Sequence, residues 1–460
     1  MLQSKIRQGL PSEIARPQAS PFTGSLVRDE SAFSGRGKLL FLSYAFPPAQ
    51  MIASVRTWNM AKYLRRLGWE ITVVTPHPSL WKHVGNAKEI ETSLDRDGIR
   101  RILTGHRWRC LVPDYLNGWN QNLGWLAGGI CRRIAGRLEI DSGIGWVQAA
   151  EKACSQLTSR DVDVILASGS PFAAFTLARR LSKKLHRPYV LDYRDPWTGN
   201  PDVARPATRL TIRREERLLT NCDAVTIVSN SWGVLMDRRF GLGSRLHVIS
   251  NGYDPDELAG VKPHVFGHFA IVYAGTFYPP KRVVSPVMAA LRRLEQDERA
   301  GDTEWYFHYY GGHGKHVMEE AKQCGVTERV IVHGKVERNE TLSAIKGAGV
   351  AVVITSVVAE GDEEDKGMVT GKIFEAVGLG TPVLLVAPHG SDANTVVETT
   401  GLTGSFSGSD IEGMASFLSD AIRGQVPEPK DPQAYAWPNL AKAFDSLLRD
   451  VAALQRQGTR

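Results

Sequence analysis

The sequence predicts two tandem, doubly wound α/β domains, each built on a parallel, Rossmann-like sheet. Short apolar runs typical of buried strands alternate with amphipathic helical segments along most of the chain. The alternation is interrupted over 251–267, a stretch rich in Gly, Pro and Asp, and then starts again. With 460 residues, 42% of them apolar and 23% charged, the chain is long enough and hydrophobic enough for two packed cores.

The first domain is expected to cover 38–252. It follows an N-terminal extension, 1–37, which has no apolar signal core and which we expect to be flexible. A strand over 38–44, a helix over 54–67 and a strand over 70–75 predict a βαβ unit. The same alternation predicts a helix over 171–185 and further strands over 163–167, 189–193, 224–229 and 247–250.

The second domain is expected to cover 253–433. A helix of two to three turns is predicted from Thr370 to Gly380, and the tail over 440–454 has helical periodicity. The predicted strands of this domain lie at 269–275, 305–309, 330–333, 350–355 and 383–387.

Cysteine content and hydropathy indicate a cytoplasmic protein. The five cysteines are scattered and form no CxxC pair, which fits a reducing compartment. The longest nearly apolar stretch, 348–359, is shorter than the 18 or so residues that a membrane span needs. We therefore expect no transmembrane helix.

The net charge of +7 is unevenly distributed. Residues 1–250 hold 36 Lys and Arg against 21 Asp and Glu, whereas the remainder holds 20 against 28. A basic first half can face nucleic acid, an anionic membrane surface or a phosphorylated substrate, and charge alone does not choose among them. Ordinary surface variation is a further alternative.

Residues 81–147 allow two interpretations. An amphipathic patch at a membrane surface, or an acceptor site, is one. A buried aromatic cluster with solvated arginines is the other, and we favour it. The stretch contains five tryptophans and a basic cluster: Trp81, Trp108, Trp119, Trp125, Trp146, Arg132, Arg133 and Arg137.

Parallel sheets place ligands at the carboxyl ends of their strands, so the loops that leave the strands are the candidate sites. The loop 44–56 could offer backbone amides to an anion, and an ordinary turn is an equal alternative. In LDYRDPW, 191–197, Asp195 could accept a proton or hold a sugar hydroxyl, while Arg194 pairs with it or with a phosphate. A structural Arg-Asp pair is the alternative here.

Two loops of the second domain offer cations. Lys281 and Arg282 end the loop YAGTFYPPKR, where a lysine can neutralise a departing diphosphate; a solvated lysine is the alternative. The helix predicted from Thr370 presents its N-terminus to an anion, and Glu375 in its second turn can accept two hydrogen bonds from a ribose diol. A surface ion pair between Lys372 and Glu375 is the competing interpretation.

With these motifs the chain resembles the retaining glycosyltransferases of family 4, which have the GT-B fold. Each motif is short, but together they occur in the family's order over 38–453, which makes the combined pattern specific. The matching segments are the FPP turn, LDYRDPW, VISNGYDPDE, AGTFYPPKR, YYGGHGKH, VHGKV and GKIFEAVGLGTPVLLVAPHGSDA.

The resemblance implies an N-terminal acceptor domain, a C-terminal nucleotide-sugar domain and a cleft between them. It also implies that the segment 434–460 returns to the first domain as a helix. On this basis Lys281 contacts the donor diphosphate and Glu375 the ribose. The other implied donor contacts are the backbone around Val369 and Thr370 at the diphosphate, Gly334, Lys335 and Val336 at the base, and Gly311 and Gly312 beside the donor. Arg282, Gly371 and Lys372 are also expected to bind the donor.

The chain also departs from the family pattern. The family often has a glutamate eight positions before the residue that matches Glu375, and here that position is Gly367. Many members have a histidine near the sugar in the first domain; LDYRDPW has none, so Asp195 is the stand-in candidate. Asp161 and Asp163 spell DxD, the metal motif of another transferase fold, but they enter a strand at the end opposite to ligand sites.

Front-face substitution with retention, without an obligatory protein nucleophile, metal or cofactor, is the mechanism that the resemblance implies. The expected partners are a nucleotide-diphosphate sugar and a glycan or polyprenyl-diphosphate-linked acceptor of bacterial polysaccharide or glycolipid assembly, and no nucleic acid. A lipid-linked acceptor would bring the basic domain to the inner face of the membrane. The alternatives are a nucleotide-sugar epimerase or hydrolase, and an inactive donor-binding partner of a glycosyltransferase complex.

Overall fold

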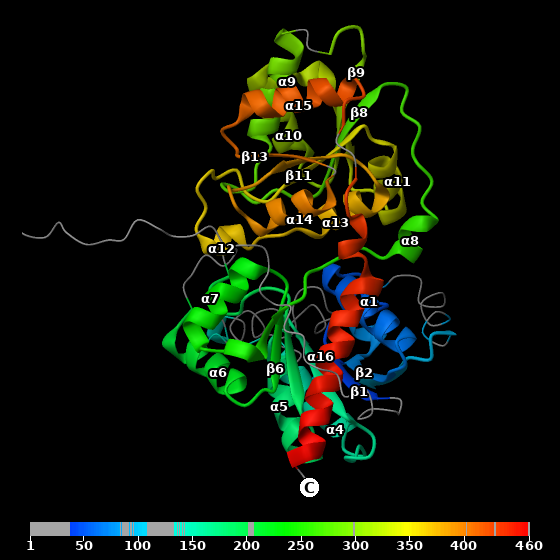
Figure 1. Cartoon of the computed structure of the whole chain (residues 1–460), viewed down its shortest axis with the longest axis vertical. Coiled ribbons are helices and arrows are strands. Elements are labelled where there is room, and N and C mark those ends of the chain that lie inside the picture. Colours follow the sequence, from blue (N-terminus) through cyan, green and yellow to red (C-terminus); the bar gives the residue numbers. More distant parts are fainter. Residues whose placement is uncertain are drawn as a thin grey trace, which may run out of the picture. The chain divides into compact units, whose positions relative to one another are not determined.

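Two parallel sheets organise the chain in the computed structural model (Figure 1). The structure describes residues 37–82, 84, 92, 94, 96–107, 133–135, 137, 139, 141, 143–200, 207–297, 300–401, 403–426 and 429–458. Within these residues, seven strands form the first sheet in the order β3-β2-β1-β4-β5-β6-β7. Six strands form the second, in the order β10-β9-β8-β11-β12-β13. Each order reverses direction once, as in a doubly wound fold.

The first sheet contains every strand that the sequence predicted for this half, together with an additional edge strand, β3. Its members are β1 (Lys38–Ser43), β2 (Glu70–Pro76), β3 (Arg100–Thr104), β4 (Val164–Gly169), β5 (Tyr189–Tyr193), β6 (Ala224–Ile227) and β7 (Leu246–Val248). The central strands β1, β4 and β5 are buried almost throughout, whereas β3 is partly exposed and opens with two arginines. An edge strand of mixed polarity lacks the continuous apolar run by which a buried strand is predicted.

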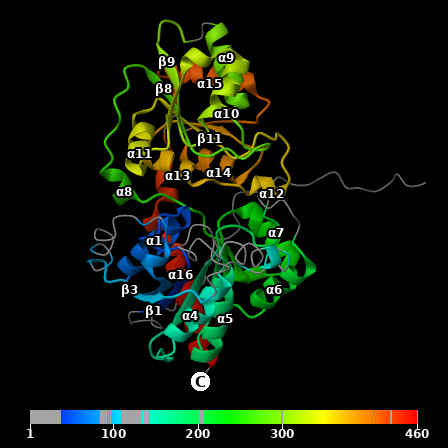
Figure 2. The ribbon, with the colours of Figure 1, turned by 180° about the vertical axis from the view of Figure 1, so that it is seen from behind.

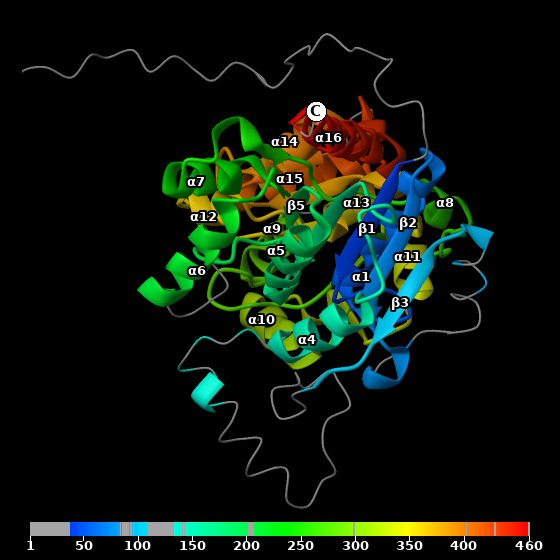
Figure 3. The ribbon, with the colours of Figure 1, turned by 90° about the horizontal axis from the view of Figure 1, so that it is seen from below.

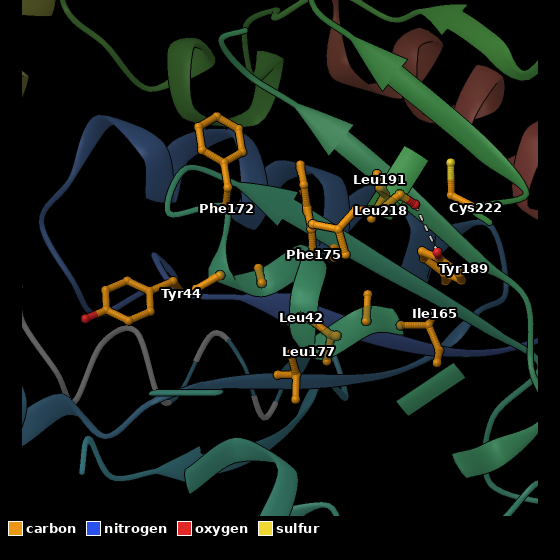
Figure 4. Packing of buried hydrophobic residues seen from close by; sticks show 14 of the residues in the cluster. Leu42, Tyr44, Ile165, Phe172, Phe175, Leu177, Tyr189, Leu191, Leu218 and Cys222 are labelled. Atoms are coloured by element: carbon orange, nitrogen blue, oxygen red, sulfur yellow. Dashed lines mark hydrogen bonds between the residues drawn. The ribbon is translucent and has the colours of Figure 1, made fainter. Parts of the chain in front are cut away.

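One face of the first sheet is covered by α4 (Ile144–Ala153), α5 (Ala173–Leu185), α6 (Arg209–Leu219) and α7 (Asn230–Phe240). The apolar side of α5 packs on the sheet, where Phe175 lies beside Leu191 and Leu218 (Figure 4). The Tyr189 hydroxyl closes the cluster with a 3.0 Å hydrogen bond to the Leu218 carbonyl. This helical layer fixes the loops that leave β4, β5 and β6.

The helix α1 (Ile52–Arg66) packs beside α16 (Trp437–Gly458), the C-terminal helix. Figure 3 shows α16 and α4 on opposite faces of the strands β1 and β2. Asp445 of α16 accepts a 2.7 Å hydrogen bond from the Trp69 indole, and Arg449 donates to the Leu67 carbonyl. The last helix of the chain is therefore packed on the first domain.

The second sheet consists of β8 (Phe269–Ala274), β9 (Trp305–Tyr310), β10 (Val330–Gly334), β11 (Val350–Ile354), β12 (Val383–Val386) and β13 (Thr403–Phe406). Figures 1 and 2 show α9 (Ser285–Gln296), α10 (Gly314–Cys324) and α15 (Ile411–Ile422) on one face. The other face carries α11 (Arg338–Gly347), α13 (Gly371–Leu379) and α14 (Asp392–Thr400). The strand β13 was not predicted, because its sequence TGSF has one large apolar residue.

The segment that joins the two sheets is bound to α1. Arg56 donates to the carbonyls of Ile249 and Ser250, and Lys62 lies 2.7 Å from Asp254 in a buried ion pair. Asp254 in turn caps the short helix α8 (Pro255–Ala259). The first turns of the second domain are thus held by a helix of the first.

A buried aromatic cluster is confirmed for two of the five tryptophans between residues 81 and 147. Trp81 and Trp146 pack edge-on against Tyr44, with ring centroids 5.8 and 5.4 Å away. Arg133 and Arg137 are exposed. Trp108, Trp119, Trp125 and Arg132 lie outside the described residues. None of the helices in the described part of the chain has both the length and the hydropathy that a membrane span needs.

Candidate functional site

The order of the second sheet reverses between β8 and β11. The chain leaves β8 toward α9 on one face and leaves β11 toward α13 on the other. Loops that diverge at such a point form the usual ligand site of an open α/β sheet. The first loop carries Lys281 and Arg282, and the second contains the short helix α12 (Glu363–Lys366) and leads into α13.

Lys281 joins these two loops. Its ammonium lies 2.6 Å from Asp365 of α12, and its carbonyl accepts a 2.7 Å hydrogen bond from the Val357 amide. The hydrogen bond to Asp365 raises the pKa of Lys281, although burial opposes the shift. Nearly half of the Lys281 side chain is exposed, so the ammonium combines a fixed partner with access to a ligand.

Arg282 is held beside Lys281 by its own loop. Its backbone exchanges two hydrogen bonds with Tyr278, of 2.9 and 3.0 Å, and its guanidinium lies over the Tyr278 ring at 4.9 Å. The guanidinium also donates to the Thr355 carbonyl at the end of β11. The two cations of this loop therefore lie beside the strand that leads to α13.

Lys372 adds a third positive charge from the first turn of α13. Burial lowers its pKa, Arg282 and Arg338 lower it further, and Glu375 opposes the shift. Its side chain runs along the backbone of Gly275, where a Cβ would lie 2.6 Å from the Lys372 Cε. Gly275 thus leaves room for Lys372, and a bound anion there would reduce the repulsion among the cations.

The N-terminus of α13 is open to a ligand. Thr370 is its N-cap residue but makes no capping hydrogen bond, and its Oγ1 is buried without a partner among the described residues. The first amides of a helix need acceptors, and an anion can supply them. Val369 packs on the apolar cluster beneath this helix, and Gly371 is exposed at its first position.

Glu375 pairs with a residue that the sequence did not single out. Its Oε1 lies 2.7 Å from Arg338 Nη1, and the same guanidinium donates to Glu257 at 2.8 Å. Burial lowers the pKa of Arg338, but the two carboxylates outweigh this effect and raise it above its ordinary value. The described contact of Glu375 is thus with α11, and Lys372 points instead toward Gly275.

The loops after β8, β9 and β10 come together around Gly275. The Tyr309 hydroxyl donates to the Gly275 carbonyl at 2.8 Å, and a Cβ on Gly311 would collide with that same carbonyl. The Gly311 amide donates to the Gly334 carbonyl at 2.8 Å. The structure therefore gathers Lys372 and the predicted glycines into one region, with Lys335 packed over Gly312 and Val336 on the apolar cluster.

Arg194 and Asp195 belong to the first sheet, at the carboxyl end of β5. Arg194 donates to the Gly169 carbonyl at 2.7 Å and to the Ser170 carbonyl, so it holds the loop that follows β4. Asp195 is partly buried. These two predicted residues thus lie in a different group of loops from Lys281, Lys372 and Glu375.

The two aspartates of the DxD sequence bind backbone groups. Asp163 accepts a 2.9 Å hydrogen bond from the Lys38 amide where β1 begins, and Asp161 accepts from the Thr158 amide at 2.8 Å. Both residues precede β4. They lie at the end of the sheet opposite to the ligand-binding loops, as the sequence predicted.

A contact between the two domains explains Gly367. A Cβ at this position would lie within 2.6 Å of three atoms of the Trp232 indole. The Trp232 Nε1 donates to the Glu364 carbonyl at 2.8 Å. Sequence reasoning missed Trp232, because a contact between residues so far apart follows from domain packing and has no local signal.

A cavity of about 240 Å³ lies next to this contact. It is lined by the loop after β5, including Thr198 and Gly199, by apolar and basic side chains of α7, and by Glu364 of α12. Thr198, which lines the cavity, donates a hydrogen bond to the buried carboxylate of Glu215. Burial raises the pKa of Glu215 to about 7.

Comparison with known proteins places the chain among sugar-transferring enzymes. The model of Glycosyltransferase Family 4 matches residues 53–257, and that of Glycosyl transferases group 1 matches residues 268–424. Each match contains most of one sheet. No curated protein sequence matches the chain.

Several solved structures share the two-sheet fold. Sucrose-phosphate synthase from Thermosynechococcus elongatus has a TM-score of 0.61 at 14% identity, over 91% of this chain and all of that one. The lipopolysaccharide outer core galactosyltransferase WaaB, in its apo form, has a TM-score of 0.54 at 14% identity, over 90% and 99%. HepE of Anabaena, in complex with UDP, has a TM-score of 0.51 at 16% identity, over 92% and 98%.

The two family matches follow one another along most of the chain, and the solved structures share its pair of Rossmann-like domains. The chain belongs to the family 4 and group 1 glycosyltransferases and has the GT-B fold.

Proposed function

We propose that the protein is a retaining, metal-independent glycosyltransferase whose donor is a nucleotide-diphosphate sugar. The observation that supports this most strongly is that Lys372, in the first turn of α13, lies within electrostatic reach of Arg282 at a helix N-terminus that has no side-chain cap. Lys281, the neighbour of Arg282 in its loop, is held by Asp365 of the helix that precedes α13. Amides at a helix N-terminus and nearby ammonium or guanidinium groups are the groups that bind phosphates in proteins. HepE of Anabaena, which shares the fold, was solved in complex with UDP.

Each group then has a defined task. Lys281 and Lys372 neutralise the charge that develops on the departing diphosphate, and a preorganised cation of this kind contributes on the order of 3 kcal/mol to the transition state. Glu375 accepts hydrogen bonds from the ribose, exchanging them for its contact with Arg338. The loops at Gly311 and Gly334 to Val336 border the sugar and the base.

The reaction is a substitution at the anomeric carbon on the face that the diphosphate leaves. The bond from this carbon to the phosphate oxygen breaks, and a bond to the acceptor oxygen forms on the same face. The acceptor hydroxyl gives its proton to the departing phosphate oxygen. No protein nucleophile enters this scheme, so the chain must position the two substrates and stabilise the leaving group.

The acceptor that we propose is a glycan or a polyprenyl-diphosphate-linked sugar of bacterial polysaccharide or glycolipid assembly. The basic first half of the chain, with 36 Lys and Arg against 21 Asp and Glu, favours an anionic acceptor. Such an acceptor would bring the protein to the cytoplasmic face of the membrane. Transfer rates that are equal at low and at high salt would count against an anionic acceptor.

Product analysis tests the proposal. A thermal-shift panel of UDP, GDP, ADP and TDP and their sugars first identifies the donor, because a ligand of the native state raises its stability. The matching labelled sugar is then incubated with polyprenyl-diphosphate-linked acceptors, and the product's anomeric configuration is determined by NMR. A product that keeps the donor configuration supports the proposal, and an inverted product contradicts retention. An altered or hydrolysed free nucleotide sugar would indicate an epimerase or hydrolase, and binding without turnover an inactive partner.

A further inference from the structure

The helix α12 lies between Lys281 and the first domain. Asp362 caps it by accepting a hydrogen bond from the Asp365 amide, and the Asp365 carboxylate binds Lys281. Four residues are too few to form a stable helix alone, so neighbouring groups must fix its position. The position of Lys281 therefore depends on what holds α12.

Trp232 of α7 supplies the main contact to this segment. Its indole Nε1 donates to the Glu364 carbonyl within α12, and the ring covers Gly367 just after it. Trp232 is 2% exposed, so almost its whole side chain is used in packing. A buried indole that also donates a hydrogen bond is an effective anchor.

Both ends of α7 are attached to the second domain as well. At the first turn, the Ser231 amide donates to Asp392 at 2.8 Å. At the last turn, Arg238 donates to both carboxylate oxygens of Glu363, at 2.8 and 3.0 Å. This ion pair is exposed and therefore screened by solvent, so the buried indole is the stronger of the contacts to α12.

We propose that Trp232 is a positioning residue for the transfer reaction. By holding the Glu364 carbonyl and the Gly367 backbone, it fixes α12, and Asp365 then orients the Lys281 ammonium toward the diphosphate. This inference rests on the proposed function of Lys281. On this proposal the effect of Trp232 on catalysis passes through Lys281.

A double-mutant cycle tests this route. Trp232→Ala should lower kcat/KM at least about tenfold, whereas in a Lys281→Ala background the same change should have almost no further effect, because the two residues act in one chain of contacts. Losses that multiply in the double variant would overturn the proposal, because they would show that Trp232 acts independently of Lys281.

Further variants separate positioning from general stability. Trp232→Phe keeps a ring over Gly367 but removes the donor to the Glu364 carbonyl, so its activity should fall between those of the wild type and Trp232→Ala. Gly367→Ala places a methyl group against the indole and should reduce activity to a similar extent as Trp232→Ala. It therefore tests the same contact if Trp232→Ala does not fold. Gly260→Ala is the matched control, since no atom lies within 4 Å of its new Cβ. Equal losses for Gly367→Ala and Gly260→Ala would overturn the proposal.

A second measurement does not depend on enzyme activity. Competitive acetylation with acetic anhydride, read by mass spectrometry, compares Lys281 with the exposed Lys183 in the full chain. Asp365→Asn and Trp232→Ala should both raise the relative reactivity of Lys281 severalfold, whereas Gly260→Ala should leave it unchanged. Unchanged reactivity in Trp232→Ala would overturn the positioning route. If both variants show the expected rise in Lys281 reactivity but the wild-type protein transfers no sugar, the proposed reaction is rejected and the positioning of Lys281 by Trp232 is kept.

Discussion

Asp192 accepts two hydrogen bonds from Arg56, of 2.8 and 3.3 Å, and both side chains are almost completely buried. Burial raises the pKa of Asp192, but Arg56 and two hydroxyl donors outweigh it and hold the pKa below its ordinary value. The same guanidinium donates to the Ile249 and Ser250 carbonyls at the end of the first domain. The pair therefore joins the centre of the first sheet to the segment that leads into the second.

Removing one partner of this pair should be costly. Arg56→Leu leaves the Asp192 carboxylate buried without its counter-charge and should lower the free energy of unfolding by about 3–5 kcal/mol. Urea unfolding followed by circular dichroism measures the change. Arg180→Leu, which breaks the exposed pair with Glu151, is the control and should cost under about 1 kcal/mol. Similar changes in the free energy of unfolding for the two variants would show that the buried pair stabilises the protein no more than the exposed pair does.

Lys281→Ala should lower the rate of sugar transfer at least about tenfold, because it removes a cation from the departing diphosphate. The partly exposed side chain lies outside the core, so the midpoint of thermal unfolding should change little. Steady-state kinetics with the donor varied measure the loss. If Lys281→Ala is as active as the wild type, Lys281 does not act on the donor.

Glu375→Ala should also reduce transfer at least about tenfold, mainly through a higher KM for the donor, because the ribose loses its acceptor. Glu375→Gln keeps the shape of the side chain and one acceptor oxygen, so it should lose less. Arg338→Ala separates the ion pair of Glu375 from its proposed contact with the ribose, because this variant breaks the ion pair but keeps the Glu375 carboxylate. If Glu375→Ala and Arg338→Ala have the same effect on KM, the contact within the protein explains the loss, and the ribose contact is wrong.

The buried Glu215 should make stability depend on pH. Burial raises its pKa from an ordinary 4.5 to about 7, so the native state holds a proton that the unfolded chain releases. This stabilisation is complete below pH 4.5 and is lost as the pH rises to 7, by roughly 3 kcal/mol in total. Urea unfolding at several pH values should show a decline that Glu215→Gln abolishes. The same slope in that variant would assign the decline to other groups.

The sequence allows the buried strands to be predicted because each is a short, continuous apolar run between turns. Thus β5 was predicted with its observed bounds, and β8 to within one residue. The edge strands β3 and β13 were missed, since edge positions accept polar and small residues and need no apolar run. The strand-loop-helix order then placed Lys281 and Lys372 at the correct end of the second sheet.

Contacts between distant segments could not be predicted in this way. Trp232 has the pattern of an ordinary core residue of α7, and only the packed structure reveals that its indole covers Gly367. No local pattern singles out Arg338 either, although it binds Glu375 and Glu257. Asp192 gave a weak signal, as a carboxylate inside an apolar strand, that sequence reasoning left unused.

Calorimetric titration with the nucleoside diphosphate chosen by the thermal-shift panel tests the donor site most directly. The wild-type protein should bind this diphosphate at least about tenfold more tightly than either Lys281→Ala or Lys372→Ala, whereas the corresponding nucleoside should bind all three proteins equally, because it has no phosphate for the cations. Equal affinity of the diphosphate for the wild type and both variants would contradict a phosphate site between the loop of Lys281 and the start of α13.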